Sequence, residues 1–448
     1  MHRPGWAEQA EAQLNEFHGW LRQNHPDVAV VVGTTAMVAM GKGDRRVLAN
    51  CAVMMLGERR QATAKTLIPF YDVFHESRYF ESAADLPDGL RSTFVLGDKA
   101  VGLLICEDSW HDMTLHGREV HQENPTRRLK ELGANFLVNI SASPYDRAKR
   151  SRRRDQMSKT ARAHGLTIAY VNHFGAQDDI LFDGDAFVMG PDGEATAGKV
   201  EANGDMLLVR LDGGKKQATA PADAELRDLH RMLVVSIRDY ARKNGFSRAV
   251  LGLSGGIDSA LVAALAAEAL GSENVVGLAM PSKYSSSHSV EDAEELARNI
   301  GMPLRHFPIK MPHSTFSLAL KPFFEGMPED TTEENLQSRL RGVAVMAFAN
   351  KLKALALATG NKSEFAMGYA TLYGDMCGAL APIGDLLKTE VYELSRYLNR
   401  LKAQIPERTI TKAPSAELKP NQTDQDTLPP YDLLDAALRL LVEQELDP

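Results

Sequence analysis

Short apolar runs separated by polar stretches recur along the first half of the chain. They are rich in Val, Ile and aromatic residues and are shorter than typical buried helices, so the pattern predicts β-strands. Between two of them, Asn124 and Pro125 are typical of a helix start and Gly133 of its end. Alternating strands and helices indicate an α/β layered domain. The apolar runs are residues 28–33, 47–56, 100–106, 135–140, 167–172 and 182–190.

A polar stretch at residues 212–225 interrupts this pattern and predicts a linker, because it lacks apolar periodicity and contains Gly and Pro. Beyond it, helical and strand patterns alternate, which is typical of a doubly wound parallel sheet. We therefore expect two domains, at residues 1–211 and 226–448. The expected helices are residues 226–245, 258–271 and 290–301, and the expected strands are residues 249–254, 275–281 and 304–310.

Composition and charge narrow the class of protein. The 448 residues are 44% hydrophobic and 25% charged, which is typical of globular proteins and not of disordered or fibrous ones. With 51 Lys and Arg against 59 Asp and Glu the net charge is −8, whereas nucleic-acid binders are usually basic. The basic run at residues 147–154 is therefore expected to be a solvated helix face and not a nucleic-acid site.

The chain shows no sign of a membrane or secretory role. No apolar stretch is long enough to span a bilayer, and the first residues lack the apolar core of a secretory signal. The cysteines, Cys51, Cys106 and Cys377, are too few for a disulfide framework. We expect a soluble, cytoplasmic protein.

A glycine-rich loop, LGLSGGIDS at residues 251–259, lies between a predicted strand and a predicted helix. Its glycines let backbone N–H groups and the helix N-terminus face an anion. Because it lacks the Lys of the GxxxxGK[ST] loop, it suits enzymes that hold the pyrophosphate end of ATP and release AMP. Asp258 can bind Mg²⁺ on those phosphates through a carboxylate oxygen. The alternative is a simple glycine turn with Asp258 as an ordinary helix N-cap.

Further polar motifs follow in order along the second half of the chain. They are TEENLQSRLRG (332–342), TGNKSE (359–364), GYATLYGDM (368–376), DLLKTEVYELSRYLN (385–399) and PSAELKPNQTDQDTLPPYDLLD (414–435). Together with SGGIDS they resemble the NAD⁺ synthetase family of pyrophosphate-loop enzymes over most of residues 226–445. Related amidotransferases share only the SGGIDS loop, so the resemblance is specific.

The resemblance implies a role for each matching residue. The residues matching ATP contacts are Gly252, Leu253, Ser254, Gly255, Gly256, Ile257, Asp258, Ser259, Thr359, Lys388 and Ser415. The residues matching deamido-NAD⁺ contacts are Asn335, Arg339, Arg341, Glu364 and Asp375. Asp258 and Glu364 match the Mg²⁺ ligands. For Lys388 the alternative is an exposed charge on a helix.

Cys106 ends an apolar run in the first half and has two interpretations. A cysteine at a strand end can be a nucleophile if a cation and a base assist it, but a free cysteine is more often a small buried hydrophobe. The surrounding segments, residues 65–80, 105–110, 139–149 and 171–188, resemble the nitrilase-type glutaminase domain of glutamine-dependent NAD⁺ synthetases. By that resemblance Cys106 is the nucleophile, Lys65 the assisting cation, and Tyr71, Ser143 and Lys149 bind glutamine.

The chain departs from this family pattern at both ends. The early strand with the general-base Glu and the basic C-terminal tail have no counterpart, so an incomplete α-β-β-α sandwich is expected. Glu8, Glu11 and Glu16 lie in a predicted amphipathic helix and do not match the base, whereas Glu76 is spaced to assist Lys65. Because losing a general base typically costs about 10²–10⁴-fold in rate, we expect an impaired glutaminase.

The resemblance implies a carbon–nitrogen ligase that uses glutamine as its nitrogen donor. ATP and Mg²⁺ would convert the carboxylate of deamido-NAD⁺ to an acyl-adenylate, and ammonia from glutamine would then form NAD⁺, with AMP and pyrophosphate released. The alternatives are a synthetase that uses only free ammonia, another pyrophosphate-loop ligase such as a GMP or asparagine synthetase, and a non-catalytic nucleotide-binding remnant. The family also implies a homo-oligomer, a dimer or larger.

Overall fold

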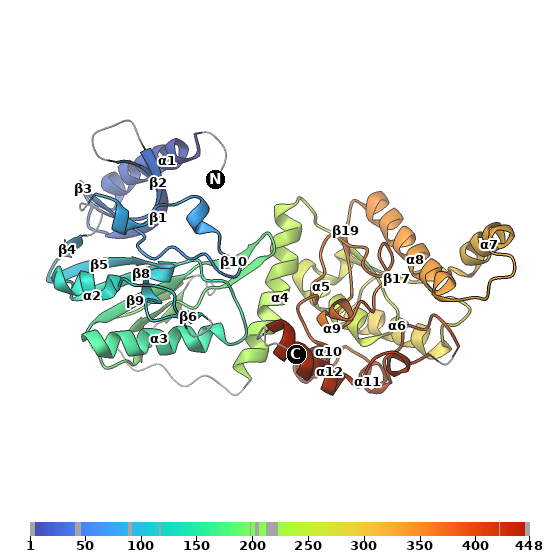
Figure 1. Cartoon of the computed structure of the whole chain (residues 1–448). Helices are drawn as coiled ribbons and strands as arrows, with labels where there is room; N and C mark the ends of the chain where they lie inside the picture. Colours follow the sequence, from blue (N-terminus) through green and yellow to red (C-terminus); the bar gives the residue numbers. More distant parts are fainter. Residues whose placement is uncertain are drawn as a thin grey trace. The chain divides into compact units, whose positions relative to one another are not determined.

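The computed structural model divides the chain into two compact units (Figure 1). Unit 1 is Met1–Phe174 with Phe182–Pro221, and unit 2 is Gly175–Leu181 with Ala222–Pro448. The predicted linker at residues 212–225 lies almost wholly outside the described residues. The structure describes residues 5–40, 46–87, 92–115, 118–197, 199–201, 206–211, 223–420 and 422–443.

The short segment Gly175–Leu181 departs from the predicted continuous first domain, because its contacts are with the second unit. The backbone N–H of Ala176 donates to Asp239 Oδ2 at 3.0 Å. Lys243 Nζ donates to Gln177 Oε1 at 2.7 Å. Asp239 and Lys243 both belong to α4 (Ala224–Lys243), the first helix of unit 2.

Unit 1 contains a six-stranded mixed sheet in the order β13-β12-β9-β8-β5-β4. Its centre, β5, β8 and β9, is parallel, and the outer pairs are antiparallel. The strands are β4 (Thr93–Leu96), β5 (Lys99–Ile105), β8 (Phe136–Ser141), β9 (Thr167–Asn172), β12 (Phe187–Met189) and β13 (Ala195–Thr196). Residues 182–190, predicted as one strand, are divided between β11 (Ile180–Asp183) and β12, because Gly184 and Asp185 have positive φ angles.

A second, antiparallel sheet of unit 1 has the order β1-β2-β3, with β1 (Val30–Ala39), β2 (Arg46–Leu56) and β3 (Arg59–Ala64). Successive side chains of β2 point to opposite faces of this sheet, which explains why the sheet lies between α1 and the six-stranded sheet. Val53 and Met55 pack against Leu14 and Leu21 of α1 (Trp6–Asn24), whereas Ala52 and Met54 pack in one core with Leu103 and Ile105 of β5. The sequence missed β3 because its exposed face is polar.

Two helices cover the other face of the six-stranded sheet. Leu129 of α2 (Pro125–Glu131) and Met157 of α3 (Lys149–His164) pack with Leu104, Leu137 and Ile168 of the sheet. Unit 1 therefore has the predicted α-β-β-α layers, with α1 and α3 on opposite faces (Figure 1). Its remaining short elements are η1 (Glu76–Arg78), η2 (Ala83–Asp85), η4 (Cys106–Ser109), β6 (Thr114–Leu115), β7 (Arg118–Glu119), β14 (Lys199–Glu201) and β15 (Met206–Leu208). Strand β10 (Phe174–Gln177) pairs with β11 and, apart from Phe174, belongs to the segment Gly175–Leu181 of unit 2.

Unit 2 is built on a parallel sheet in the order β18-β17-β16-β19, as predicted. Strand order reverses between β16 and β19, and open α/β sheets bind ligands beyond the carboxyl ends of their strands at such a switch point. Helix α8 (Thr331–Leu352) packs on the sheet through Ala344 and Val345. The strands are β16 (Ala249–Gly252), β17 (Val275–Ala279), β18 (Leu304–His306) and β19 (Leu355–Leu357).

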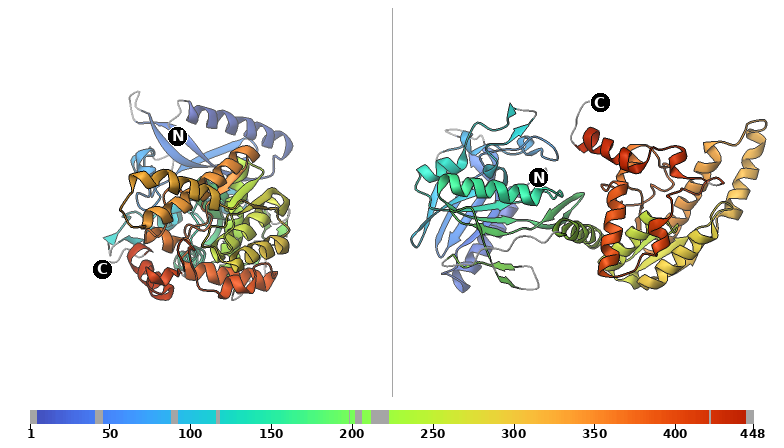
Figure 2. Two further views of the ribbon diagram at one scale, coloured as in Figure 1. Left: turned by 90° about the vertical axis from the view of Figure 1, so that its right-hand side faces the viewer. Right: turned by 90° about the horizontal axis from the view of Figure 1, so that it is seen from below.

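The helices of unit 2 surround this sheet (Figure 2). Besides α4 they are α5 (Ile257–Leu270), α6 (Ser287–Ile300), α7 (Lys310–Leu320), α8 (Thr331–Leu352), α9 (Lys362–Ala366), α10 (Lys388–Leu401), α11 (Glu407–Thr411) and α12 (Tyr431–Leu438), with the short helical turns η6 (Ser272–Asn274), η7 (Lys321–Phe323), η8 (Asp424–Asp426) and η9 (Arg439–Glu443). None of the helices in the described ranges is long and apolar enough to cross a membrane.

Candidate active sites

The glycine-rich loop of unit 2 joins β16 to α5 and is shaped as the sequence predicted. Gly255 has φ +79°, and a Cβ there would lie 2.2 Å from the Ser289 carbonyl oxygen, so no other residue fits without a shift. Ser259 Oγ accepts the Ser254 N–H at 3.3 Å and closes the loop. The N-cap of α5 is Gly256, which has no capping side chain, so Asp258 is not the ordinary N-cap of the alternative interpretation.

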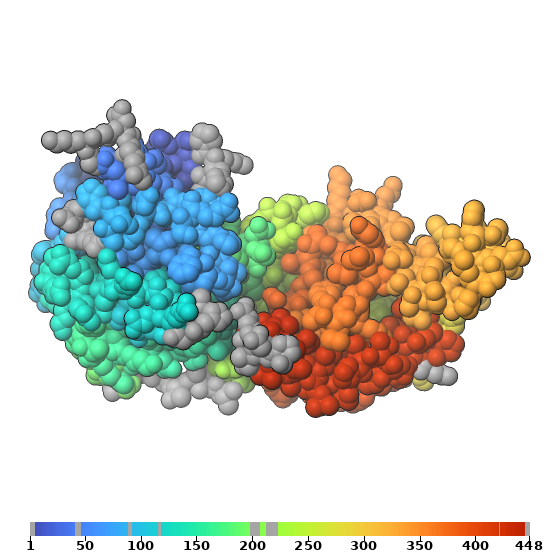
Figure 3. Space-filling view, viewed as in Figure 1, coloured from blue at the N-terminus to red at the C-terminus, as the bar shows by residue number. Residues whose placement is uncertain are grey.

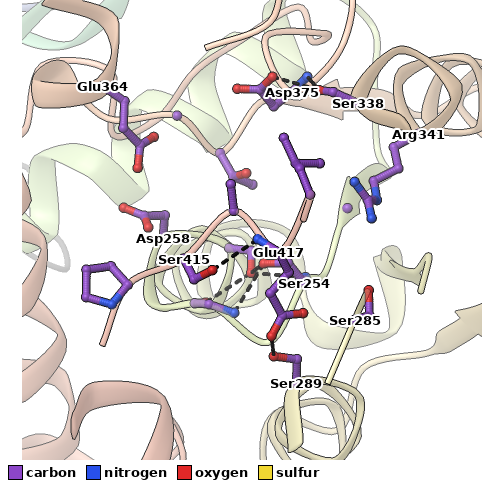
Figure 4. A pocket seen from close by; sticks show the side chains of 18 of the residues that line it. Ser254, Asp258, Ser285, Ser289, Ser338, Arg341, Glu364, Asp375, Ser415 and Glu417 are labelled. Carbon is purple, nitrogen blue, oxygen red and sulfur yellow. Dashed lines mark hydrogen bonds between the residues drawn. The ribbon is translucent and has the colours of Figure 1, made fainter. Parts of the chain in front are cut away.

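A cavity of about 810 Å³ lies beside this loop (Figure 4). Gly255 is not among its lining residues in the described chain, because the residue packs against Ser289 behind the loop. Arg339 is also absent from that lining, and its Nε donates to the Leu372 carbonyl oxygen at 3.3 Å. The predicted residues that line the cavity are Gly252, Leu253, Ser254, Gly256, Ile257, Asp258, Ser259, Asn335, Arg341, Thr359, Glu364, Asp375, Lys388 and Ser415.

Lys388 is buried at one end of the cavity and is not an exposed helix charge, since only 2% of its surface is accessible. Its Nζ donates to Asp258 Oδ2 at 2.5 Å and to Glu364 Oε1 at 3.1 Å. Burial lowers the pKa of Lys388, but the charges of Asp258 and Glu364 outweigh burial and raise the pKa well above its usual value. The site therefore holds a permanent cation facing the phosphate loop.

The two carboxylates beside Lys388 come from the first turns of α5 and α9 and lie on the same side of the cavity (Figure 4). Asp258 Oδ1 also accepts from Asn361 Nδ2 at 2.8 Å. Burial and the neighbouring Asp258 charge raise the pKa of Glu364 to about 7, although Lys388 opposes this shift. Burial therefore penalises the negative charge of Glu364 unless a cation accompanies it.

This donor set fits Mg²⁺, which prefers carboxylate and phosphate oxygens. In the described part of the chain no group of three or more His, Cys, Asp and Glu side chains is arranged to hold a metal ion. Asp258 and Glu364 could thus supply two ligand positions, and phosphate oxygens or water would supply the others.

The opposite side of the cavity carries Arg341 and polar groups of α8 (Figure 4). Ser338 Oγ donates to Asp375 Oδ1 at 2.8 Å, and Thr371 Oγ1 donates to Asn335 Oδ1 at 2.9 Å. Burial lowers the pKa of Arg341 to about 10, which still leaves it charged near neutral pH. This arrangement brings the predicted residues Asn335, Arg341 and Asp375 to one wall, and Arg339 is not among them.

In unit 1, Cys106 directly follows β5 and opens η4, so it is not the last strand residue that the sequence predicted. It has φ +46°, a left-handed conformation that is costly for a residue with a side chain. The conformation turns the chain sharply away from the strand. Burial raises the pKa of the Cys106 thiol, while the nearby Lys65 charge opposes this.

Lys65 is fully buried next to this thiol, with 1% of its surface accessible. Its Nζ donates to Glu76 Oε1 at 2.7 Å, as the spacing in the sequence predicted. Burial lowers the pKa of Lys65, but the charges of Cys106 and Glu76 reverse the shift and raise it. Lys65 therefore remains protonated beside the sulfur.

Asp108 is a residue of this site that the sequence analysis missed. Its Oδ1 accepts the N–H groups of Thr66 and Leu67 at 2.9 and 2.8 Å, and its Oδ2 accepts the Ile105 N–H at 3.0 Å. Burial raises the pKa of Asp108 to about 6, although these hydrogen bonds oppose the shift. Asp108 joins the segment that carries Lys65 to the segment that carries Cys106.

The predicted glutamine-binding residues surround η4. Tyr71 donates its hydroxyl hydrogen to Glu107 Oε1 at 2.6 Å, and Lys149 Nζ lies 5.5 Å from the Trp110 ring centroid. The backbone of Ala142, which precedes Ser143, hydrogen-bonds Cys106 and favours its thiolate. Ser143 itself is buried.

Glu107 was also missed, although its position directly after the cysteine was a signal. It is buried, and its Oε1 contacts His121 Nε2 at 2.8 Å in addition to Tyr71. Nothing in the local sequence connects His121 to this turn.

The basic run at residues 147–154 is neutralised largely by the chain's own carboxylates. Arg153 and Arg154 pair with Asp185 at 3.4 and 2.6 Å, and Arg152 pairs with Asp146. The run differs from the predicted solvated face at Arg153, which is fully buried. The Arg153 guanidinium therefore forms its ion pair with Asp185 inside unit 1.

The two sites define a class of protein. A phosphate loop that faces a buried lysine and two carboxylates is typical of ATP-dependent adenylating enzymes, and a cysteine beside a buried lysine is typical of amide hydrolysis. Both on one chain define an ATP-dependent carbon–nitrogen ligase with an attached amidase.

Comparison with known proteins identifies the family. The NAD synthase family matches residues 229–448. The glutamine-dependent NAD(+) synthetase of Synechocystis sp. is 44% identical over 454 residues, covering 99% of this chain and 80% of that protein. The enzyme of the same name from Thermotoga maritima is 39% identical, covering 93% of this chain and 77% of that protein. The chain belongs to the glutamine-dependent NAD⁺ synthetase family.

Solved structures agree with this assignment. The glutamine-dependent NAD⁺ synthetase of Acinetobacter baumannii in complex with ADP has a TM-score of 0.78 and 34% identity, covering 99% of this chain and 78% of that one. A glutamine-dependent NAD(+) synthetase from Cytophaga hutchinsonii has a TM-score of 0.74 and 20% identity, covering 98% and 77%, and supports the fold alone.

Proposed function

We propose that this chain converts deamido-NAD⁺ to NAD⁺ with ATP, releasing AMP and pyrophosphate, and that glutamine supplies the nitrogen. The observation that carries the proposal is the buried Lys388 held by Asp258 and Glu364 beside the phosphate loop. Family membership supports the choice of substrates over those of GMP or asparagine synthetases.

The chemistry in unit 2 follows from this geometry. A nicotinate oxygen of deamido-NAD⁺ attacks the α-phosphorus of ATP, and pyrophosphate leaves with the bonding electrons. Loop N–H groups and Lys388 Nζ stabilise the negative charge that develops on the leaving group. Mg²⁺ bound by Asp258 and Glu364 would neutralise further phosphate charge. Ammonia then attacks the acyl carbon, a proton is lost, and AMP leaves.

In unit 1, the Cys106 thiolate attacks the amide carbon of glutamine. Lys65 stabilises the oxyanion of the tetrahedral intermediate. The proton lost by the Cys106 thiol passes to the departing nitrogen, so that ammonia leaves, and water then hydrolyses the thioester to glutamate. Glu107, Tyr71 and Lys149 supply charges and donors suited to the amino and carboxylate groups of glutamine. The proposed use of ATP as a co-substrate supports a cytoplasmic location.

Product analysis tests the proposal. Purified protein with Mg²⁺, ATP and deamido-NAD⁺ is expected to form NAD⁺, AMP and pyrophosphate in equal amounts. The rate is expected to be lower with glutamine than with ammonium, in keeping with the impaired glutaminase that the sequence predicts. Product from ammonium alone would restrict the proposal to free ammonia as nitrogen donor. ATP binding without turnover, or amidation of xanthylate or aspartate only, would contradict it.

We also propose that the chain forms a homo-oligomer, at least a dimer, through α7, η7 and the segment that leads from η7 into α8. This region projects from unit 2 (Figure 3) and has exposed apolar side chains that a second copy would cover. Each of them is between 68% and 78% exposed: Met311, Leu318, Phe323 and Met327.

Light scattering checks this oligomer. The protein is expected to have at least twice its chain mass of 49.2 kDa, and the double substitution Leu318→Asp with Phe323→Asp is expected to give a monomer. Charges buried in an apolar interface without partners oppose association. An unchanged chain that is monomeric at micromolar concentration would contradict the proposal.

A further inference from the structure

Lys388 and Glu364 act together, but they lie on different helices. Glu364 is in the first turn of α9, and Lys388 is the first residue of α10. Their 3.1 Å contact therefore depends on how the starts of these two helices are held relative to each other. Neither side chain can fix this distance alone, since each is attached to its own helix.

Ser363 makes the first connection between the helix starts. It directly precedes Glu364 and is fully buried. Its Oγ accepts the backbone N–H of Lys388 at 2.8 Å. A hydroxyl has one hydrogen to donate, so this geometry requires the hydrogen of Ser363 to point at another acceptor.

That acceptor is Asp435 of α12. Its Oδ1 accepts the Ser363 hydroxyl hydrogen at 2.6 Å, and its Oδ2 accepts the backbone N–H of Thr389 at 2.8 Å. Asp435 is buried and is not among the residues lining the cavity in the described chain. One carboxylate thus ties the start of α9 and the start of α10 to a third helix.

Helix α12 also contacts the other end of Lys388. The Tyr431 ring centroid lies 5.4 Å from Lys388 Nζ, and the Tyr431 hydroxyl donates to Asp424 Oδ2 at 2.8 Å. Asp435 is one turn further along the same face of α12. The helix therefore holds Lys388 both at its backbone N–H, through Ser363, and at its ammonium group.

We propose that Asp435 is a positioning residue for the adenylation step, which holds Lys388 and Glu364 at their working distance through Ser363. The proposal rests on the proposed function, because the step that it serves is the ATP-dependent activation of deamido-NAD⁺. Asp435 touches no reacting atom; it acts by orienting the Ser363 hydroxyl and the first backbone N–H groups of α10.

The substitution Asp435→Asn tests this role. Both partners of Asp435 donate hydrogen, so the amide either loses the Thr389 N–H bond or reverses the Ser363 bond, which leaves the Ser363 hydroxyl hydrogen without its buried acceptor. Because small misplacements can cost about 10²-fold in rate, kcat for ammonium-supported NAD⁺ formation is expected to fall about 10–100-fold. The KM for ATP is expected to change less than about threefold, since the phosphate loop is untouched.

Glu390→Gln is the matched control. Glu390 is also a buried carboxylate near the start of α10, and it accepts the Leu387 N–H at 2.9 Å and the Arg439 guanidinium at 2.8 Å. It therefore loses comparable bonds at the same helix end without contacting Ser363. Its kcat is expected to stay within about threefold of the unchanged chain. Urea unfolding of both variants compares their stability losses.

Ser363→Ala and the double variant complete the test. If Asp435 acts through Ser363, the kcat of the double variant is expected to lie within about twofold of the kcat of Asp435→Asn alone. A folded Asp435→Asn with unchanged kcat, an equal kcat loss in Glu390→Gln, or independent multiplicative losses would overturn the proposal. No NAD⁺ from the unchanged chain would instead refute the proposed function, and this positioning role with it.

Discussion

Replacing Lys388 with methionine is expected to lower ammonium-supported NAD⁺ formation by about 10²–10³-fold. The substitution keeps most of the side-chain volume but removes the only cation found within 3.1 Å of both Asp258 and Glu364 among the described residues. Removing one such electrostatic contact costs about this much in other enzymes, because the charge on the leaving group is no longer compensated. Initial rates of NAD⁺ and pyrophosphate release measure the effect.

Lys362→Met is the control for this prediction. Lys362 begins the neighbouring α9, but its Nζ pairs with Glu443 Oε1 at 2.8 Å and it does not line the cavity in the described chain. Its activity is expected to stay within about twofold of the unchanged chain. A Lys388→Met protein that folds, as judged by circular dichroism, and keeps more than a tenth of the activity would show that Lys388 has no such catalytic role.

Replacing Cys106 with alanine is expected to reduce glutamine-supported NAD⁺ formation to background and to leave ammonium-supported formation within about twofold. The nucleophile that attacks the amide is lost, so glutamine is no longer hydrolysed. Cys106 does not line the cavity of unit 2, so the reaction with ammonium is unaffected. Parallel assays with glutamine and with ammonium measure the two effects in one preparation. The glutamine analogue 6-diazo-5-oxo-L-norleucine is expected to label the unchanged chain at Cys106.

Cys51→Ala is the matched cysteine control, because Cys51 is buried in a separate apolar cluster with Ala49 and Ala64. Burial raises the pKa of Cys51 to about 11, so its thiol is unreactive at neutral pH. This variant is expected to keep glutamine-supported activity and labelling. Persistent glutamine use by Cys106→Ala, or labelling at another cysteine, would contradict the proposed nucleophile.

Much of both folds could be predicted from local patterns. The strands β5, β8 and β9 are nearly continuous apolar runs because both of their faces are covered, and such runs are visible in the sequence. The prediction failed where the local signal was weak. Polar β3 was missed, and residues 182–190 were taken as one strand although positive φ angles at Gly184 and Asp185 interrupt them.

The predicted site residues all lie in compact motifs, although not every residue of those motifs was recognised. The phosphate loop, Cys106 and the predicted residues of α8 lie in compact motifs whose spacing carries information. Asp108, Glu107 and His121 were missed, because their roles come from contacts with Thr66, Tyr71 and each other across the fold. A hydrogen bond between distant segments leaves no periodic pattern in a single sequence.

The sequence by itself determined the layered α/β architecture, the phosphate loop and the family resemblance, since each depends on local conformational preference or on contiguous motifs. The tertiary structure decided the protonation and alignment of the site. Lys388 meets Asp258 across 130 residues of chain, and Asp435 reaches Thr389 across 46. Burial and charge pairing then shift the pKa values of Lys388 and Glu364, and these effects exist only once the helices have packed.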